Sequence, residues 1–405
     1  MINSDKTDSS ANLPLVHSIR GVAAFYVVVY HAKFILWSGG KEYLSHFPKS
    51  GWNILEYLKF GVEMLFSSGS QMVMIFFVLS GFFMAMSMEN NKVTGPKKLK
   101  IFYSTRFIRI YVPYISSIVV SVLVLFWVAK YTPDLYNLSS NREFNNRLIV
   151  AYHDITIQNF LKSLVFSKNN EYIGFNYAYW SLLYEGIFYL IIPFIHRIQR
   201  QYFILSGSLF LLGIFVFSFY RVDNIFLKFT LEYNFYFAIG QAIYYYRKTI
   251  RDKLKGGKFK WILIAPSVIL FFLFNVLTLL HYEIWADLFS SIAGGLILLL
   301  FLNYNFKNTY FIKCIKNLGK ISYSLYLIHI PVLIFTYSIM HKITGGILYY
   351  SRFYFIAVFV CILCGFIFYK LAEEPSLALI KKVKNSFKGQ PANKKKQQLI
   401  LKVSA

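Results

Sequence analysis

The sequence has little charge and few acidic residues for its length. Only 15% of its 405 residues are charged, whereas a typical soluble domain has about 25%. The 18 Asp and Glu face 43 Lys and Arg, which gives a net charge of +25. Residues 262–280 contain no charged side chain, and a run of this length can cross a lipid bilayer. The composition excludes a soluble globular protein and a disordered chain. It also argues against a nucleic-acid partner, which the net charge alone would suggest.

Cysteine is also scarce, with Cys314, Cys361 and Cys364 alone in the chain. Three cysteines cannot staple a fold of this size, so a disulfide-rich secreted domain is excluded. Cys361 and Cys364 have C-x-x-C spacing but lie inside an apolar run. We interpret them as small buried hydrophobic residues rather than a redox pair. No metal site is expected.

Long apolar runs are abundant, and they predict an all-α, polytopic transmembrane bundle of about ten spanning helices. The two weakest candidates are the first and the sixth, which carry charged residues. The predicted spans are residues 13–36, 69–88, 110–130, 177–195, 203–220, 226–246, 261–281, 285–303, 318–341 and 350–372.

Basic residues in the connections predict the orientation of this bundle. If the N-terminus is cytoplasmic, the inner connections and tails hold 27 Lys and Arg and the outer ones hold 9. We therefore expect both termini in the cytoplasm, with an N-terminal tail at 1–12, a transmembrane domain at 13–375 and a basic C-terminal tail at 376–405. The sequence shows no internal repeat and no extra soluble domain.

The first predicted helix carries the sharpest polar signal. Arg20 and His31 are 11 residues apart, about three helical turns, so both lie on one face and are separated by about 16 Å along the axis. His17 extends this stripe toward the inner surface. The alternatives are a polar path with a titratable imidazole, or an Arg that snorkels to the interface and a His that only packs.

Other polar side chains within predicted spans are fewer. Glu185 is expected to be protonated or paired with Arg20 or His31. For the remaining ones, a role in helix packing and a place at a cavity both stay open; they are Glu232, Asn234, Ser322, Ser324, Tyr326 and His329. Arg106 and Arg109 lie one turn apart in a basic, amphipathic segment. They either contact lipid headgroups or hold a phosphorylated ligand.

Several motifs in order along the chain resemble the acyltransferase-3 family of integral-membrane acyltransferases. The first is Arg-x10-His at Arg20 and His31. The others, in chain order, are FFVLSGF at 76–82, FY-x-x-R-x-x-RI-x-x-P at 102–113, WSL-x-x-E-x-x-FYL-x-x-P at 180–193, GKISYSLYL-x-H-x-P at 319–331 and EEP at 373–375. Arg-x10-His alone is a weak signal, but the whole set covers nearly the entire chain. Two departures are the two-residue gap between Arg106 and Arg109 and the presence of His17 where an acidic or amide residue is common.

The resemblance implies an activity and a set of roles. The expected enzyme moves an acyl group, taken as acetyl, from cytoplasmic acetyl-CoA to a hydroxyl of a surface or lipid-linked carbohydrate in the inner membrane. His31 would be the general base or a transient acyl acceptor, and Arg20 would orient the thioester or stabilise charge on its carbonyl oxygen. Glu185 would orient His31 or pair with Arg20. The residues expected at the cofactor are Arg106, Arg109, His17, Ser322 and Tyr326.

Two other classes of membrane protein remain open on the sequence. A glycan polymerase, ligase or flippase also needs Arg and His within the membrane, but it normally has larger outer loops. A secondary transporter should show internal repeats and broken helices. The acceptor, the acyl chain length and the oligomeric state are not predicted.

Overall fold

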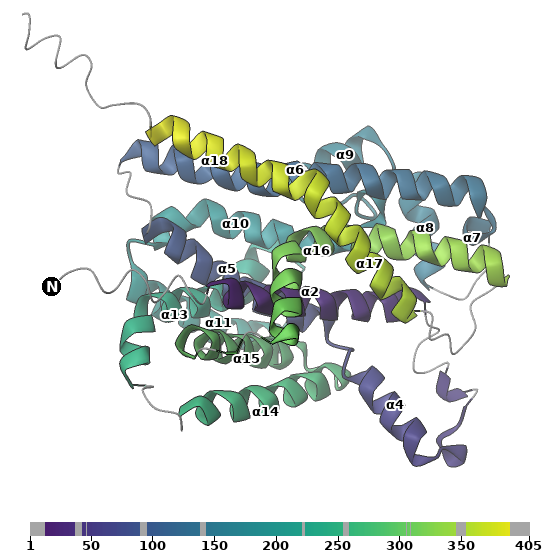
Figure 1. The fold of residues 1–405 in the computed structure, drawn as a ribbon, viewed down its shortest axis with the longest axis horizontal. Coiled ribbons are helices and arrows are strands. Elements are labelled where there is room, and N and C mark those ends of the chain that lie inside the picture. The colour runs from purple at the N-terminus through teal and green to yellow at the C-terminus, as the bar shows by residue number, and fades with distance from the viewer. Residues whose placement is uncertain are drawn as a thin grey trace, which may run out of the picture.

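The structure is a computed structural model, and Figure 1 shows its helices running mostly along one long axis. It describes residues 13–36, 43–45, 47–89, 95–137, 143–220, 223–253, 259–304, 306–307, 309–345 and 354–388. The predicted N-terminal tail at 1–12 lies outside these ranges, as does residue 389 onward of the C-terminal tail. Within them the fold is helical, without a strand.

Nine helical segments of the described chain are long and apolar enough to cross a membrane, which confirms a polytopic helical bundle. Their apolar surfaces face both the bundle core and the surrounding lipid, as expected for spanning helices. They are α2 (Leu13–Leu36), α5 (Gly69–Glu89), α6 (Pro96–Tyr131), η3 with α10 (Tyr177–Tyr179 and Trp180–Ile195), α11 (Gln199–Phe219), α14 (Phe259–Leu279), α15 (Glu283–Asn303), α16 (Tyr310–Thr344), and α17 with η5 and α18 (Tyr354–Phe368, Tyr369–Glu373 and Glu374–Lys388).

The sixth predicted span, 226–246, is helical but is not among these nine. It is built by α12 (Ile225–Lys228), the π-helical turn η4 (Phe229–Tyr233) and α13 (Asn234–Lys253). Its polar residues are buried: Asn234 donates to Ser206 Oγ at 3.0 Å and accepts from the Tyr202 hydroxyl at 2.6 Å. The segment therefore packs against α11 partly through hydrogen bonds. The polar side chains that form these bonds lower the mean hydropathy of the segment.

Two boundaries differ from the prediction. The basic segment before the third span is not separate, because α6 runs without a break from Pro96 to Tyr131. The boundary at 375 falls inside a continuous helix, since η5 passes directly into α18. The amphipathic α18 packs along α6, and Figure 1 shows the two side by side. The described part of the predicted C-terminal tail thus belongs to the helical body.

The first helix, α2, packs most extensively against α16 and also contacts α5, α15 and α17. Glycines allow the closest approach: a Cβ atom on Gly21 would lie 2.3 Å from the backbone nitrogen of Gly319. Likewise, a Cβ on Gly240 of α13 would lie 1.7 Å from the carbonyl oxygen of Val78 on α5. Small residues let transmembrane helices approach in this way, and the α2–α16 contact positions the residues described below.

Alternating helix directions give the bundle two ends. We call the end where α2 and α6 begin, and where α5, α10 and α13 finish, the basic end. The opposite end carries α4 (Ile54–Met64), which stands away from the bundle in Figure 1, and a cap of short helices. The cap comprises α7 (Asp134–Asn137), α8 (Glu143–His153), α9 (Ile157–Ser163) and η2 (Ile173–Phe175).

The cap is held by buried hydrogen bonds as well as by apolar side chains such as Phe144, Leu148 and Phe175, which belong to the hydrophobic core. Asp154 accepts hydrogen bonds from the Asn159 side chain and from the backbone amides of Asn170 and Glu171, at 3.0–3.1 Å. Glu171 forms a two-point ion pair with Arg147, at 2.6 and 3.0 Å. These contacts fix the segment that leads into η3 and α10, and therefore the position of Tyr177.

Candidate active site

The predicted polar stripe on α2 meets two separate groups of side chains. Arg20 lies against Phe76 of α5, close enough to Arg106 of α6 for their charges to interact, and His31 faces residues from η3 and α16 toward the opposite end. The two lie about 16 Å apart along the helix axis. Both side chains are only partly buried, although each lies within the helical body.

His31 is paired with a second histidine. The His31 and His329 rings are stacked, with centroids 5.2 Å apart and planes inclined by 30°. His31 Nδ1 lies 3.2 Å from the Tyr177 hydroxyl, and the Tyr30 ring contacts His31 edge-on. Three segments of the chain, α2, η3 and α16, thus converge on one imidazole pair.

The tautomer of His329 follows from its surroundings. His329 Nδ1 lies 2.7 Å from the backbone carbonyl oxygen of Tyr326, so Nδ1 carries the proton and donates it. His329 is completely buried, and its Nε2 atom has no hydrogen-bond partner among the described residues. A buried polar atom without a partner is rare and marks a place where a ligand or water is needed. This nitrogen holds a lone pair next to His31.

Tyr326 anchors this part of α16 to the start of α10. Its hydroxyl donates to the carbonyl oxygen of Ala178 at 2.9 Å and lies 2.7 Å from Ser181 Oγ. Asn176 reinforces the same junction, because its side-chain amide donates to the carbonyl oxygen of Leu327 at 2.7 Å. Since the Tyr326 hydroxyl is already engaged, the structure makes it a positioning group for His329.

Phe76 of α5 links the two groups. Its ring lies 5.7 Å from the Tyr326 ring, and the Arg20 guanidinium carbon lies 5.9 Å from its centroid. The Nε atom of Arg20 is buried without a partner among the described residues. The Arg20 guanidinium is thus held against an aromatic face and retains unused hydrogen-bond donors.

Glu185 lies near Arg20 and away from His31. It accepts hydrogen bonds from the hydroxyls of Ser80, at 2.8 Å, and Tyr189. Neither expected direct contact, with Arg20 or with His31, is formed among the described residues; the nitrogen contact of His31 is with Tyr177 instead. The physical reason is position: on α10, Glu185 lies two turns beyond Tyr177 toward the basic end.

Arg106 and Arg109 lie at the basic end, close to this carboxylate. Arg106 donates to Ser87 Oγ at 2.7 Å and lies over the rings of Phe102 and Tyr189. Its Nε atom is also buried without a partner in the described chain. The charge of Glu185 attracts Arg106, whereas Arg109 and Arg20 repel it. Three cations therefore face two carboxylates, Glu185 and Glu373, which leaves an excess of positive charge inside the bundle.

The remaining predicted residues are engaged in packing. The His17 ring stacks on Phe83 of α5 at 4.4 Å with an inclination of 8°. Ser322 donates to the carbonyl oxygen of Gly319 one turn earlier, at 3.0 Å. The stacking holds His17 of α2 against α5, close enough to Arg20 and Arg109 for their charges to act on it, whereas the hydrogen bond of Ser322 stays within α16.

The sequence did not assign a role to Tyr177 or Phe76 and left His329 open. Glu373 was noted only as part of a motif. In the structure, Glu373 is buried and accepts from the backbone amide and hydroxyl of Ser324, at 3.2 and 2.6 Å, and the charges of Arg109 and Arg20 act on it. Phe76, His329 and Glu373 lie within the motifs quoted above, whereas Tyr177 lies three residues before one of them and carried no signal of its own.

Comparison with known families gives one match over most of the chain. Residues 16–368 match the acyltransferase-3 family, described as an acyltransferase domain. Neither the comparison with curated proteins nor that with solved structures gave a match. The matched range includes Arg20, His31, the Arg106–Arg109 segment, Glu185 and His329. With its multi-pass helical bundle, this chain belongs to the acyltransferase-3 family of membrane acyltransferases.

Proposed function

We propose that the protein transfers an acyl group, acetyl in the first instance, from acyl-CoA at the basic end of the bundle to a hydroxyl of a surface or lipid-linked carbohydrate at the other end. The observation that carries the proposal is the division of the polar interior. Cations gather toward the basic end, where an anionic donor would enter, and an imidazole pair with a free nitrogen lies toward the opposite end. We place the protein in the inner membrane, with the basic end in the cytoplasm.

His31 is the proposed general base. If its Nδ1–H donates to the Tyr177 oxygen, Nε2 holds the lone pair that a base requires. This nitrogen takes the proton of the acceptor hydroxyl as the oxygen attacks the thioester carbon. The carbon–sulfur bond breaks, the ester forms, and the proton passes from His31 to the departing thiolate. Because the imidazole of His329 stays neutral, it does not repel the positive charge that forms on the protonated His31.

We propose that Arg20 binds the donor rather than stabilising charge on the carbonyl oxygen of the thioester. Its Cα lies about 16 Å from that of His31 along the axis of α2, and its guanidinium lies over Phe76, where it interacts with the charge of Arg106. We assign Arg20, Arg106 and Arg109 to the anionic and polar parts of the donor, with the thin pantetheine arm passing Phe76 toward His31. Glu185 then limits the mutual repulsion of the three cations.

The test is label transfer in a purified system. Protein in lipid nanodiscs is supplied with acetyl-CoA carrying a labelled acetyl group and with a membrane glycan fraction. Label in the glycan, lost in His31→Ala, supports the proposal. Absence of transfer from any acyl-CoA, by protein that remains folded, would favour a glycan polymerase, a flippase or a transporter. Mass spectrometry of surface glycans from cells with and without the protein identifies the acceptor.

A further inference from the structure

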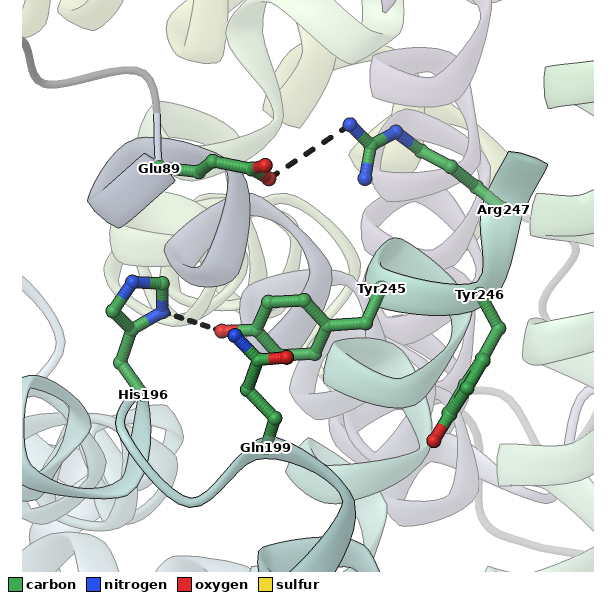
Figure 2. A pocket seen from close by; sticks show the side chains of 6 residues that line it. All are labelled: Glu89, His196, Gln199, Tyr245, Tyr246 and Arg247. Atoms are coloured by element: carbon green, nitrogen blue, oxygen red, sulfur yellow. Dashed lines mark hydrogen bonds and ion pairs between the residues drawn. The ribbon is translucent and has the colours of Figure 1, made fainter. Parts of the chain in front are cut away.

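A pocket of about 340 Å³ opens at the basic end, between the ends of α5, α10 and α13 and the start of α11. Its lining is shown in Figure 2 and consists of Glu89, His196, Gln199, Tyr245, Tyr246 and Arg247. Its volume is in the range of small-molecule sites. None of these residues belongs to the site described above.

The pocket combines a cation with aromatic rings. The Arg247 guanidinium lies over the Tyr244 ring at 3.9 Å, donates to the Tyr244 carbonyl oxygen and lies 3.8 Å from Glu89. Figure 2 shows Arg247 and Glu89 pointing toward one another across the upper side of the pocket, with Tyr245 beneath them. Tyr246 is 42% exposed. A planar base can stack on such rings, and a phosphate can bind such a guanidinium.

His196 has a defined protonation state in this wall. Burial, together with the nearby charge of Lys98, lowers the pKa of His196, and Glu89 opposes the shift. The lowered pKa favours the neutral imidazole, whose Nδ1 is hydrogen-bonded to the Tyr245 hydroxyl. Nε2 is the second polar atom of this ring, and in the tautomer in which Nδ1 accepts from Tyr245 it is a hydrogen-bond donor.

The surroundings are strongly cationic. In the sequence, the three segments that contain or follow pocket-lining residues, 89–109, 196–202 and 247–260, have 15 Lys and Arg but only two acidic residues, Glu89 and Asp252. Such a concentration raises the local density of anionic ligands. Glu89 adds a carboxylate to this pocket, which can accept hydrogen bonds from hydroxyl or amino groups.

We propose that this pocket binds the phosphorylated nucleotide end of the acyl donor. The inference rests on the proposed function and adds a docking site to it. The nucleotide base would stack on the tyrosines, and Arg247 would hold phosphate oxygens. Glu89, Gln199 and His196 would bind ribose hydroxyls and ring nitrogens.

The position of the pocket fits a donor that reaches inward. Glu89 lies two residues after Ser87, the partner of Arg106. His196 follows Glu185 by 11 residues, about 16 Å along α10. A donor arm about 16 Å long would reach from the pocket to Arg106 and Glu185. The pocket therefore lies outside the membrane interior but next to the entrance of the proposed path.

The experiment measures CoA affinity and donor preference in nanodiscs. Arg247→Gln is compared with Arg251→Gln, which removes the same charge one turn further along α13 at an exposed position outside the pocket. We expect Arg247→Gln to weaken CoA binding about tenfold, the size of a lost charge-assisted hydrogen bond. The preference for acetyl-CoA over S-acetylpantetheine, which lacks the nucleotide, should fall by a similar factor. Tyr246→Leu should also lower this preference.

A second arm separates the nucleotide from an anionic lipid headgroup, which has the same phosphate chemistry. Titrations are repeated in nanodiscs with and without anionic lipid. A loss of affinity specific to Arg247→Gln in both lipids supports the proposal. Equal CoA affinity of the two Arg variants would overturn it, and so would a difference that vanishes without anionic lipid.

The outcomes also separate this inference from the proposed function. Transfer by the wild type, with equal CoA affinity of the two variants, removes the pocket and leaves the function intact. CoA binding that depends on Arg247, without any acyl transfer, removes the function and leaves the pocket as a nucleotide site. A wild type that fails to bind CoA overturns both.

Discussion

His31 and His329 form a stacked pair across the contact between α2 and α16, with ring centroids 5.2 Å apart. Two adjacent imidazoles resist double protonation, because each charge disfavours the other. The Nδ1 proton of His329 is fixed by the Tyr326 carbonyl. The pair is therefore arranged so that one member accepts a proton while the other stays neutral.

Removing the proposed base should abolish most activity. We expect His31→Ala to lower kcat by about 10²–10⁴, the usual contribution of general-base catalysis, with little change in the donor KM. Steady-state kinetics of acyl transfer checks this. His153→Ala, at an exposed His in the cap, is the matched control and should retain activity. Near-full activity of a well-expressed His31→Ala protein would contradict the assignment.

The two histidines should act as one unit. We expect His329→Gln to lower kcat strongly, and His31→Ala/His329→Gln to be little worse than His31→Ala alone, because coupled groups are not additive. A double-mutant cycle on kcat measures this. Effects that simply multiply would show that the two imidazoles work independently.

The cations of α6 should govern the donor. Arg109→Ala is expected to raise the KM for acyl-CoA about tenfold, since a charge-assisted contact is lost, with a smaller change in kcat. Lys100→Ala, at an exposed position on the same helix, serves as the control. Unchanged donor affinity in Arg109→Ala would rule out contact of this Arg with the donor.

The charge of Glu185 can be tested apart from its hydrogen bonds. In Glu185→Gln, the amide oxygen still accepts from Ser80 and Tyr189, so the melting temperature should remain near that of the wild type. The three cations lose one of the two carboxylates that face them, and we expect donor KM and kcat both to worsen. Full activity would show that the carboxylate serves only as a hydrogen-bond acceptor.

The close approach of α2 and α16 should tolerate no added atom. We expect Gly21→Ala to destabilise the bundle by about 1–3 kcal/mol, the usual cost of overpacking, and to lower kcat by separating His31 from His329. Thermal unfolding in detergent and transfer kinetics report the two effects. In Gly207→Ala, the nearest atom to the new Cβ is a side-chain carbon at 3.5 Å, so that variant should behave like the wild type.

The sequence predicted the parts of this architecture that depend on local pattern. Apolar runs long enough for the bilayer located the nine spanning segments, and helical spacing placed Arg20 and His31 on one face of α2. It marked 226–246 as one of the two weakest spans, and the structure has continuous helix there in which Asn234 and Glu232 are buried against neighbouring helices. The hydropathy of a segment does not show whether its polar side chains are hydrogen-bonded to neighbouring helices.

The contacts between distant helices could not be predicted in this way. Glu185 was expected to pair with either His31 or Arg20, yet the structure places Tyr177 and His329 beside His31. Which faces of α2, α10 and α16 meet depends on glycine contacts such as that of Gly21 with Gly319. Such a pairing is set by tertiary packing, which leaves no periodic pattern along the chain.

The two π-helical turns, η4 and η5, change the direction in which the later side chains of their helices point. Each wide turn accommodates one extra residue and shifts the phase of everything after it by about 100°. Glu232 and Glu373 both lie within such turns, and both point inward and are buried. A helical wheel drawn continuously through η4 or η5 would assign the wrong azimuth to every later side chain. Deleting one residue from either turn should therefore rotate its carboxylate toward lipid.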